Sequence, residues 1–531
     1  MAGDPKALAF LSSSLRDASA RKDAVERAAS RTLTAAVVDL VARQNAPLSV
    51  AGEKCLAALR QPGTTVVFTG QQVGLFLGPL YTVYKAATAI KVAAALEAET
   101  GRRCVPLFWL QTEDHDFAEI NVATVARPDG TARQLRVDGY GVPPDSRVPV
   151  KHLTMGTGIQ EVVQQVAELL GEQPHVSDVM ALLTAAYRPD ATWPGAFAAL
   201  LRGLFANHGL LVVDPRTPEM ATLAAPIHRR ALQDAPAIAA ALGQRAGAMH
   251  DAGFEPQVHV RDGAPLSFFS PDAVDGPRYR LEPKDATAWT LVGHPAQRTV
   301  TTAQLLDALD TQPARFSTSA LLRPILQDTL FPTSAYVGGP AEMTYFAQLQ
   351  PLYRHFGMTM PLAIPRARFR VLDPRTRANL EALAMTADEA CGPRETALQS
   401  LAQRNAQPGM ETPQAVQERL LNAVTASLDA LEAPWTALDA TLAKHLRMTR
   451  ATLTRSVGQL TSRYARGLAQ RDDVTTARLD RVRQWLTPDG QPQERVHSVL
   501  FSASKFGAQA FVDLVVEQTQ PFHGGLQDLT P

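Results

Sequence analysis

The sequence predicts an α/β fold with a parallel sheet, followed by a long helical segment towards the C-terminal end. Two short apolar runs, Thr65 to Phe68 and Val105 to Leu110, have the composition of strands that are buried on both faces. Between them Gly78-Pro79 opens a predicted helix that runs to about Glu99, with proline at its first position. Strand, helix and strand in this order form a βαβ unit, whose two strands are parallel.

The same pattern returns later in the chain. Gly209 to Asp214 (GLLVVD) predicts a third parallel strand that ends on a carboxylate. Ala335 to Val337 predicts another strand, after which Gly338-Gly339 turns the chain and Pro340 opens a helix that runs to about Phe356. Free N–H groups and the dipole make the start of such a helix attractive to anions. Two helix starts on one sheet would hold two polar ligands, or two parts of one.

The core is expected to span residues 1–375, beginning with helices over about 3–61 and interrupted by insertions at about 121–193 and 251–325. A helical domain is expected over residues 376–490, and residues 491–531 are expected to return to the core. The insertions contain β-like pieces at Gln134 to Val137, Val148 to Leu153, Gln257 to Val260 and Ser267 to Phe269.

The helical domain has the pattern of a coiled coil. From Leu421 to Tyr464, apolar residues recur at intervals of three and four, close to a heptad repeat. Pro434 is expected to kink this helix or to separate two helices. The stretch from Arg375 to Ala406 could supply an antiparallel partner.

Composition excludes several classes of protein. The 531 residues include 52 Lys+Arg and 52 Asp+Glu, so no net charge attracts nucleic acid or an anionic membrane. No apolar run approaches the ~18 residues needed to cross a bilayer, and the N-terminus lacks the apolar region of a signal peptide. The three cysteines, Cys55, Cys104 and Cys391, are too widely spaced for a disulfide scaffold or a CxxC zinc site. We expect a cytoplasmic protein with no metal site, and no nucleic acid or membrane as partner.

The first candidate site is Gly70-Gln71-Gln72-Val73-Gly74, directly after the first strand. It lacks the GxGxxG pattern of dinucleotide binding and the GK[ST] of a P-loop. It is either an ordinary glycine-rich turn or a place where paired amides bind a ligand with many hydroxyl groups. Ligands of open α/β sheets bind at the carboxyl ends of the strands, where this loop lies.

The second candidate is Glu113-Asp114-His115-Asp116, past the end of the second strand. Histidine beside carboxylates suits a general acid or base, and the acidic cluster could instead hold an ammonium group or a divalent ion. The alternative is a solvated helix start, whose acids favour the dipole. Zinc is not expected, because no second His or Cys lies at ligand spacing.

Cationic side chains complete the set of candidates. Arg323, Arg366, Arg368 and Arg370 could each bind a carboxylate or phosphate through two nitrogens, although isolated arginines are more often structural. Lys85 and Lys91, on the first predicted helix, are expected to be solvated.

Several long motifs resemble one known family. They are Phe68 to Lys85 (FTGQQVGLFLGPLYTVYK), Phe108 to Phe117 (FWLQTEDHDF), Leu322-Arg-Pro324, Ala335 to Pro340 with Glu342, Met360-Pro361 through Pro365-Arg366, Gln493-Glu-Arg495 and Lys505-Phe-Gly507. Together, from about residue 60 to 510, they are similar to the bacillithiol synthase family of cysteine ligases.

The resemblance implies a Rossmann-like core with two connecting-peptide insertions, and a coiled-coil domain that forms a homodimer. It also implies the last step of bacillithiol biosynthesis, an amide bond between the cysteine carboxyl group and the amine of glucosaminyl-malate. This condensation is uphill in water, so the carboxyl group must be activated, with ATP as the suspected cofactor, as an acyl-adenylate or acyl-phosphate. The HIGH and KMSKS motifs of related synthetases are absent, so no motif shows ATP use.

The resemblance leads to an assignment of roles. His115, supported by Asp114 or Asp116, would deprotonate the attacking amine or hold the cysteine carboxylate. Arg323 or Arg366 would bind the malate carboxylates. The other expected substrate-binding residues are Gly70, Gln71, Gln72, Gly74 and Glu113, with Gly338, Gly339 and Glu342 opposite.

Two other functions remain open at this point. One is a nucleotidyl or acyl transferase on the same core with another acceptor. The other is a non-catalytic dimeric scaffold built around the coiled coil.

Overall fold

The computed structural model describes residues 5–11, 14–138, 146–404, 411–439, 441–470 and 473–531. It contains two compact units. The core unit comprises Met1–Pro128, Ala132–Arg370 and Glu494–Leu529, and the helical unit comprises Asp129–Thr131, Val371–Gln493 and Thr530–Pro531.

A five-stranded sheet forms the centre of the core unit, with the order β12-β11-β1-β2-β5 and every neighbouring pair parallel. Its strands are β1 (Thr65–Gln71), β2 (Cys104–Leu110), β5 (Leu211–Val213), β11 (Thr333–Gly338) and β12 (Leu362–Pro365). The chain builds outwards from β1 through β2 to β5, and then returns to the other side of β1 with β11 and β12. The order therefore reverses between β1 and β11. In open α/β sheets this switch point is where ligands bind.

Both faces of this sheet are buried, as expected for parallel strands. Val66 and Phe68 of β1 pack in one apolar cluster, while Val67 between them packs in another on the opposite face. The predicted α/β class with a parallel sheet is confirmed.

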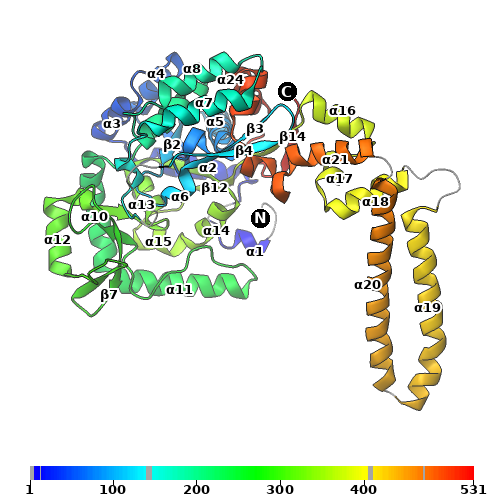
Figure 1. The fold of residues 1–531 in the computed structure, drawn as a ribbon. Coiled ribbons are helices and arrows are strands. Elements are labelled where there is room, and N and C mark those ends of the chain that lie inside the picture. The colour runs from blue at the N-terminus through cyan, green and yellow to red at the C-terminus, as the bar shows by residue number, and fades with distance from the viewer. Residues whose placement is uncertain (1–4, 12–13, 139–145, 405–410, 440, 471–472) are drawn as a thin grey trace. The chain divides into compact units, whose positions relative to one another are not determined.

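Helices surround the sheet on both sides (Figure 1). Those before β5 are α1 (Pro5–Leu8), α2 (Ala18–Ala29), α3 (Ala35–Asn45), α4 (Val50–Leu59), α5 (Tyr81–Thr100), α6 (Phe117–Ile120), α7 (Gly158–Leu170), α8 (Val176–Ala186) and α9 (Trp193–Leu204). Those after β5 are α10 (Pro218–Gln233), α11 (Ala235–Asp251), α12 (Thr302–Thr311), α13 (Leu322–Leu330), α14 (Pro340–Gln348), α15 (Gln350–His355), α22 (Gln493–Val496), α23 (Leu500–Phe506) and α24 (Ala508–Gln518).

Smaller sheets accompany the central one. An antiparallel sheet has the order β10-β6-β7-β8-β9. Its strands are β6 (Ser267–Phe269), β7 (Tyr279–Pro283), β8 (Ala288–Val292), β9 (Thr299–Thr301) and β10 (Phe316–Thr318). The two-stranded sheets are β3 (Val122–Ala126) with β4 (Ala132–Arg136), and β13 (Arg368–Val371) with β14 (Leu526–Leu529).

Two predicted β pieces are wrong. Residues 148–153 contain a 3-10 turn, Val150–His152, because the Val150 and Lys151 N–H groups donate to the carbonyls of Asp114 and Thr112. Residues 257–260 form no strand, because the side-chain amide of Gln348 takes the place of a strand partner. It accepts from the Val258 N–H at 3.0 Å and donates to the Val258 carbonyl at 2.8 Å.

The helical unit contains α16 (Pro374–Ala382), α17 (Ala387–Cys391), α18 (Arg394–Arg404), α19 (Pro413–Leu438), α20 (Thr441–Gln470) and α21 (Asp473–Leu486). Helices α19 and α20 lie side by side as a long hairpin (Figure 1), which confirms the predicted coiled-coil domain. Pro434 does not separate them, because α19 continues through it to Leu438. Leu438 and Met448 are exposed on the hairpin. Dimer formation through this unit stays a prediction.

Membrane-spanning helices and metal-binding clusters are both absent from the described residues. None of their helices has both the length and the apolarity needed to cross a membrane. None of their His, Cys, Asp and Glu side chains form a group of three or more that could hold a metal ion.

Candidate active site

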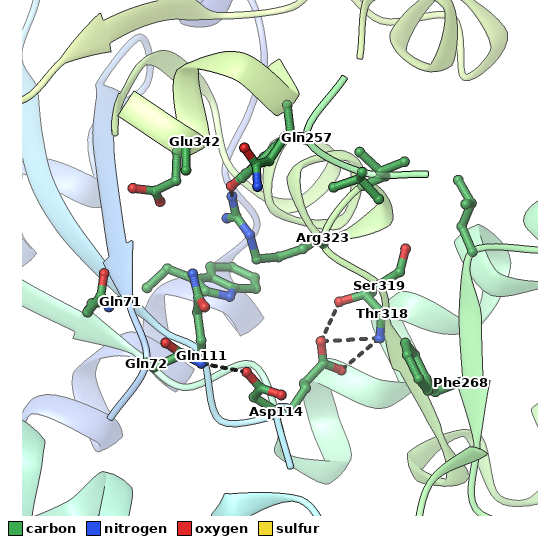
Figure 2. A pocket seen from close by; sticks show the side chains of 18 of the residues that line it. Gln71, Gln72, Gln111, Asp114, Gln257, Phe268, Thr318, Ser319, Arg323 and Glu342 are labelled. Atoms are coloured by element: carbon green, nitrogen blue, oxygen red, sulfur yellow. Dashed lines mark hydrogen bonds between the residues drawn. The ribbon is translucent and has the colours of Figure 1, made fainter. Parts of the chain in front are cut away.

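A cavity of about 760 Å³ opens in the core unit at the carboxyl ends of β1, β2 and β11. It therefore lies at the switch point of the sheet. Figure 2 shows Gln71 and Gln72, from the end of β1 and the loop after it, on one side, with Arg323 of α13 and Glu342 of α14 nearby and Phe268 and Thr318 across the cavity. The antiparallel sheet thus supplies the wall that faces the central sheet.

A buried ion pair at the switch point links α5, which follows β1, to α14, which follows β11. The Lys85 ammonium group on α5 pairs with the Glu342 carboxylate and also donates to the Gly70 carbonyl and to Gln71 Oε1, both at 2.8 Å. Burial lowers the pKa of Lys85, although Glu342 opposes that shift. The expectation that Lys85 is solvated is wrong, since only 3% of it is exposed. The periodicity of α5 did not reveal this, because the helix is buried on most sides.

Glu342 satisfies three groups at once. Besides Lys85, it accepts from the Tyr336 hydroxyl at 2.7 Å and from the Gly339 N–H at 2.8 Å. Burial alone would raise the pKa of Glu342, but Lys85 and these hydrogen bonds outweigh it and hold the pKa below its usual value. The first turn of α14 is therefore capped by its own glutamate.

The two predicted arginines differ in how far their charge is neutralised. Arg366 binds Glu494 through both terminal nitrogens, at 2.8 and 2.9 Å, and both side chains are buried. Arg323 is also buried, but it donates to neutral groups, Gln327 Oε1 at 2.9 Å and the Tyr345 hydroxyl at 3.1 Å. Both line the cavity.

The loop after β2 brings Asp114 and His115 to the cavity. Asp114 accepts from Gln72 Nε2 at 2.9 Å (Figure 2), from the His115 N–H at 2.7 Å and from Arg278 at 3.3 Å. Burial alone would raise the pKa of Asp114, but Arg278 and these donors hold it below its usual value. Gln72 therefore contacts the acidic loop directly.

His115 is neutral in this environment. Burial, followed by the charge of Arg278, lowers the pKa of His115 to about 4. Arg278 Nε donates to His115 Nδ1 at 3.0 Å, so the proton of the neutral ring lies on Nε2. The ring offers the cavity a hydrogen-bond donor.

The two other acids of this loop have different surroundings. Glu113 accepts from both the N–H and the hydroxyl of Thr318, and burial raises its pKa. Asp116 is exposed and does not line the cavity; it caps α6 by accepting from the Glu119 N–H at 3.3 Å.

Three of the predicted glycines do not line this cavity. A Cβ at Gly70 would lie 2.9 Å from the Trp109 carbonyl oxygen, and one at Gly338 would lie 2.6 Å from Met343 Cε. These two glycines permit close packing of the strand ends. Gly74 lines a neighbouring cavity, and Gly339 lines the large one.

Sequence reasoning missed three arginines in and beside the antiparallel sheet, of which Arg280 is in β7, Arg278 directly precedes it and Arg261 lies in the loop before β6. Arg278 contacts His115 and Asp114 and packs on the Phe268 ring at 4.3 Å, and burial lowers its pKa to about 10. Arg261 and Arg280 both pair with the single carboxylate of Glu282. They lie in a segment without a recognisable motif, where only the clustering of arginines was a signal.

The lining of the large cavity carries a net positive charge. Its basic side chains are Lys85, Arg261, Arg278, Arg280, Arg323, Arg366 and Arg495, against Glu113, Asp114, Glu119 and Glu342. Such a cavity favours ligands with carboxylate or phosphate groups.

Comparison with known proteins identifies the family. The N-terminal Rossmann-like domain of bacillithiol biosynthesis BshC matches residues 2–367, and the C-terminal coiled-coil domain of the same family matches residues 369–527. The chain belongs to the BshC family. The resemblance predicted from the motifs is therefore confirmed, and so is the Rossmann-like and coiled-coil architecture.

Relatives with the curated name "Putative cysteine ligase BshC" match most of the chain. Those of Salinibacter ruber and Koribacter versatilis are both 33% identical, over 86% of this chain and 82% of each relative. That of Solibacter usitatus is 34% identical, over 89% of this chain and 87% of the relative. These names support the predicted ligase class. A crystal structure titled as an arginyl-tRNA synthetase of Campylobacter jejuni aligns at 8% identity over 90% of this chain and 99% of that one, with a TM-score of only 0.24.

Proposed function

We propose that this BshC-family chain is a ligase that joins the carboxyl group of cysteine to the amine of glucosaminyl-malate, the last step of bacillithiol biosynthesis. The main support for this function is the basic cavity at the switch point, because the family's motifs after β1, β2 and β11 all meet there. Its excess of cations suits the two carboxylates of the malyl group, and its amides suit the hydroxyl groups of a sugar.

The reaction forms one C–N bond and breaks one C–O bond. The amine nitrogen attacks the carboxyl carbon, the nitrogen loses protons, and one carboxyl oxygen leaves. ATP, when bound, supplies the phosphoryl or adenylyl group that makes this oxygen a leaving group, so the products would include ADP and phosphate or AMP and pyrophosphate. Arg261 and Arg280 share one carboxylate, which leaves a positive charge that would hold the phosphates of ATP.

Arg323 is the better of the two predicted binders of malate. Both terminal nitrogens of Arg366 are already bound to Glu494 in a buried ion pair, a carboxylate that Arg368 shares at 3.1 Å. Arg323 lines the same cavity and donates to an amide oxygen and a phenol. An incoming carboxylate would therefore provide the anionic partner for Arg323, which the neutral groups do not.

His115 acts as a donor in this proposal. The lone pair of Nδ1 already accepts from Arg278, so the ring has no free nitrogen with which to deprotonate the amine. Its Nε2–H would donate to a carboxylate oxygen of a reactant in the large cavity, with Asp114 fixing Arg278 and thereby the ring. Asp116 would support the loop through its cap on α6.

The reaction is tested by mass spectrometry of the purified protein with cysteine, glucosaminyl-malate and ATP. A new thiol with the mass of the amide, absent without enzyme or without ATP, is the expected result. Turnover of another amine acceptor, with none of glucosaminyl-malate, would favour a transferase on the same core. No product and no thermal stabilisation by any reactant would favour a scaffold.

Two substitutions separate the donor role of His115 from that of a base. His115→Gln places an N–H donor near the position of Nε2, whereas His115→Asn can replace only the Nδ1 acceptor. We expect His115→Gln to keep kcat/KM within about tenfold of wild type, and His115→Asn to lower it by roughly 10²-fold, the scale for losing one positioned hydrogen-bond donor. Equal, large losses in both variants would indicate a base.

A further inference from the structure

A second cavity, of about 330 Å³, lies beside the first in the core unit, at the start of α5. Five residues line both cavities: Gln71, Gln72, Tyr81, Glu119 and Arg495. Molecules bound in the two cavities would therefore meet at a shared wall. This arrangement suits an enzyme that must bring two reactants together.

The first turn of α5 carries one hydroxyl group that the fold does not use, while the Leu80 N–H before it donates to the His497 carbonyl. No side chain caps this helix of 20 residues. Thr82, in its first turn, lines the second cavity and is fully buried, and its Oγ1 has no hydrogen-bond partner among the described residues. A buried hydroxyl without a partner is costly. The helix dipole and the hydroxyl both favour an anionic group in this cavity.

The charges of the second cavity are balanced. Arg495 is its cation, and it is exposed and has no ion pair in the described part of the chain. Glu119 is its carboxylate and accepts from Gln72 Nε2 at 2.7 Å. Apolar side chains that include Leu77, Ile120 and Val122 supply part of the remaining wall. The large cavity instead has more cations than carboxylates.

We propose that the second cavity is the subsite for the amino-acid reactant, a small zwitterion with an uncharged side chain. Its carboxylate would lie by Arg495, Thr82 and the start of α5, and its ammonium group by Glu119. The apolar wall would accept the CH2–SH group. This inference rests on the proposed ligase, in which that reactant is cysteine and the acceptor occupies the large cavity.

Steady-state kinetics tests the subsite through the KM of each reactant. Arg495→Gln should raise the KM for cysteine at least tenfold and the KM for glucosaminyl-malate by less than threefold, because the large cavity keeps its other cations. Thr82→Val, which keeps the shape of the side chain, should raise the KM for cysteine three- to tenfold, and Thr82→Ser should restore it. Arg261→Gln, which alters only the large cavity, should raise the KM for ATP and leave the KM for cysteine unchanged. A rise in the KM for glucosaminyl-malate alone would overturn the inference.

Calorimetry separates this inference from the proposed reaction, because it needs no turnover. L-cysteine should bind the full-length protein, and Arg495→Gln should weaken that binding at least tenfold, with circular dichroism confirming the fold. L-malate is the second probe. If Arg495→Gln weakens the binding of L-malate instead, the second cavity binds the acceptor and the inference is wrong. If wild type makes no product but L-cysteine binding follows Arg495 and Thr82, the reaction fails while the subsite stands.

Discussion

Helices α5 and α14 begin in the same way, yet their first turns have different surroundings. Each follows a parallel strand, a glycine-containing loop and a Gly-Pro pair, Gly78-Pro79 for α5 and Gly339-Pro340 for α14. At α14 the Glu342 carboxylate accepts from the Gly339 N–H and binds Lys85. At α5 no side chain caps the start, which faces the second cavity; the Leu80 N–H donates to the His497 backbone carbonyl instead, at 2.8 Å.

The two helix starts differ in whether a carboxylate is present at the third helical residue. Glu342 is two residues beyond Pro340, where a carboxylate can reach back to the helix start. Helix α5 begins only at Tyr81, two residues beyond Pro79, and its third residue, Val83, has no carboxylate. A helix start that carries its own carboxylate has its N–H groups and its dipole satisfied within the protein. One that lacks it keeps its attraction for an external anion.

The largest effect on stability is expected from Glu342→Gln, which should break the ion pair with Lys85 at the start of α14. Lys85 would stay buried without its carboxylate, and removing one partner of a buried ion pair costs about 3–5 kcal/mol. Urea denaturation followed by the fluorescence of Trp109 and Trp193, both buried, measures the loss in free energy of unfolding.

Two control variants make this result specific. Glu26→Gln removes an exposed pair with Arg102, so it should leave the free energy of unfolding nearly unchanged. The double variant Lys85→Met with Glu342→Gln should recover part of the loss. A single Glu342→Gln as stable as Glu26→Gln would show that α14 does not depend on its glutamate.

A smaller effect is expected from adding one methyl group at each loop. A Cβ at Gly338 would lie 2.6 Å from Met343 Cε and 2.9 Å from Glu342 Cβ, so Gly338→Ala should cost about 1–3 kcal/mol by overpacking. A Cβ at Gly74, before α5, would meet nothing closer than Gly78 Cα at 3.4 Å. Gly74→Ala should therefore change the free energy of unfolding by about 0.5 kcal/mol or less. The opposite order, measured by the same denaturation, would contradict the comparison.

The smallest effect concerns pH. The folded pKa of Glu342 is lowered from 4.5, so its stabilising contribution is complete above pH 4.5 and is lost as the pH falls through the folded value. The stability gap between wild type and Glu342→Gln should therefore narrow below pH 4.5, by at most about 1.4 kcal/mol per pH unit. Thermal unfolding from pH 7 to pH 3.5 measures it. A gap that widens in acid would mean that Glu342 is not stabilised as a carboxylate.

Much of the fold could be predicted from local sequence. The runs at Thr65 and Val105 are short, apolar and bounded by glycine, so their strands and the helix between them were evident. The pieces at residues 148–153 and 257–260 were misread, because their backbone partners are a distant loop and the side chain of Gln348. A local sequence pattern carries no information about partners that are so distant in the chain.

The site was predictable where chemistry is concentrated in one loop. Gln72, Asp114 and His115 were found because each follows a strand. Arg278 was missed because its partners Asp114 and His115 lie more than 160 residues away in the chain. Lys85 was misjudged for the same reason, since Glu342 is remote in sequence and only the fold brings the two together.

A crystal structure of the full-length protein soaked with L-cysteine tests the central comparison most directly. Electron density for the amino acid in the second cavity, with its carboxylate near Arg495 and Thr82 and none at the start of α14, is the predicted result. Density at the start of α14, with Glu342 displaced from the Gly339 N–H and the second cavity empty, would contradict it.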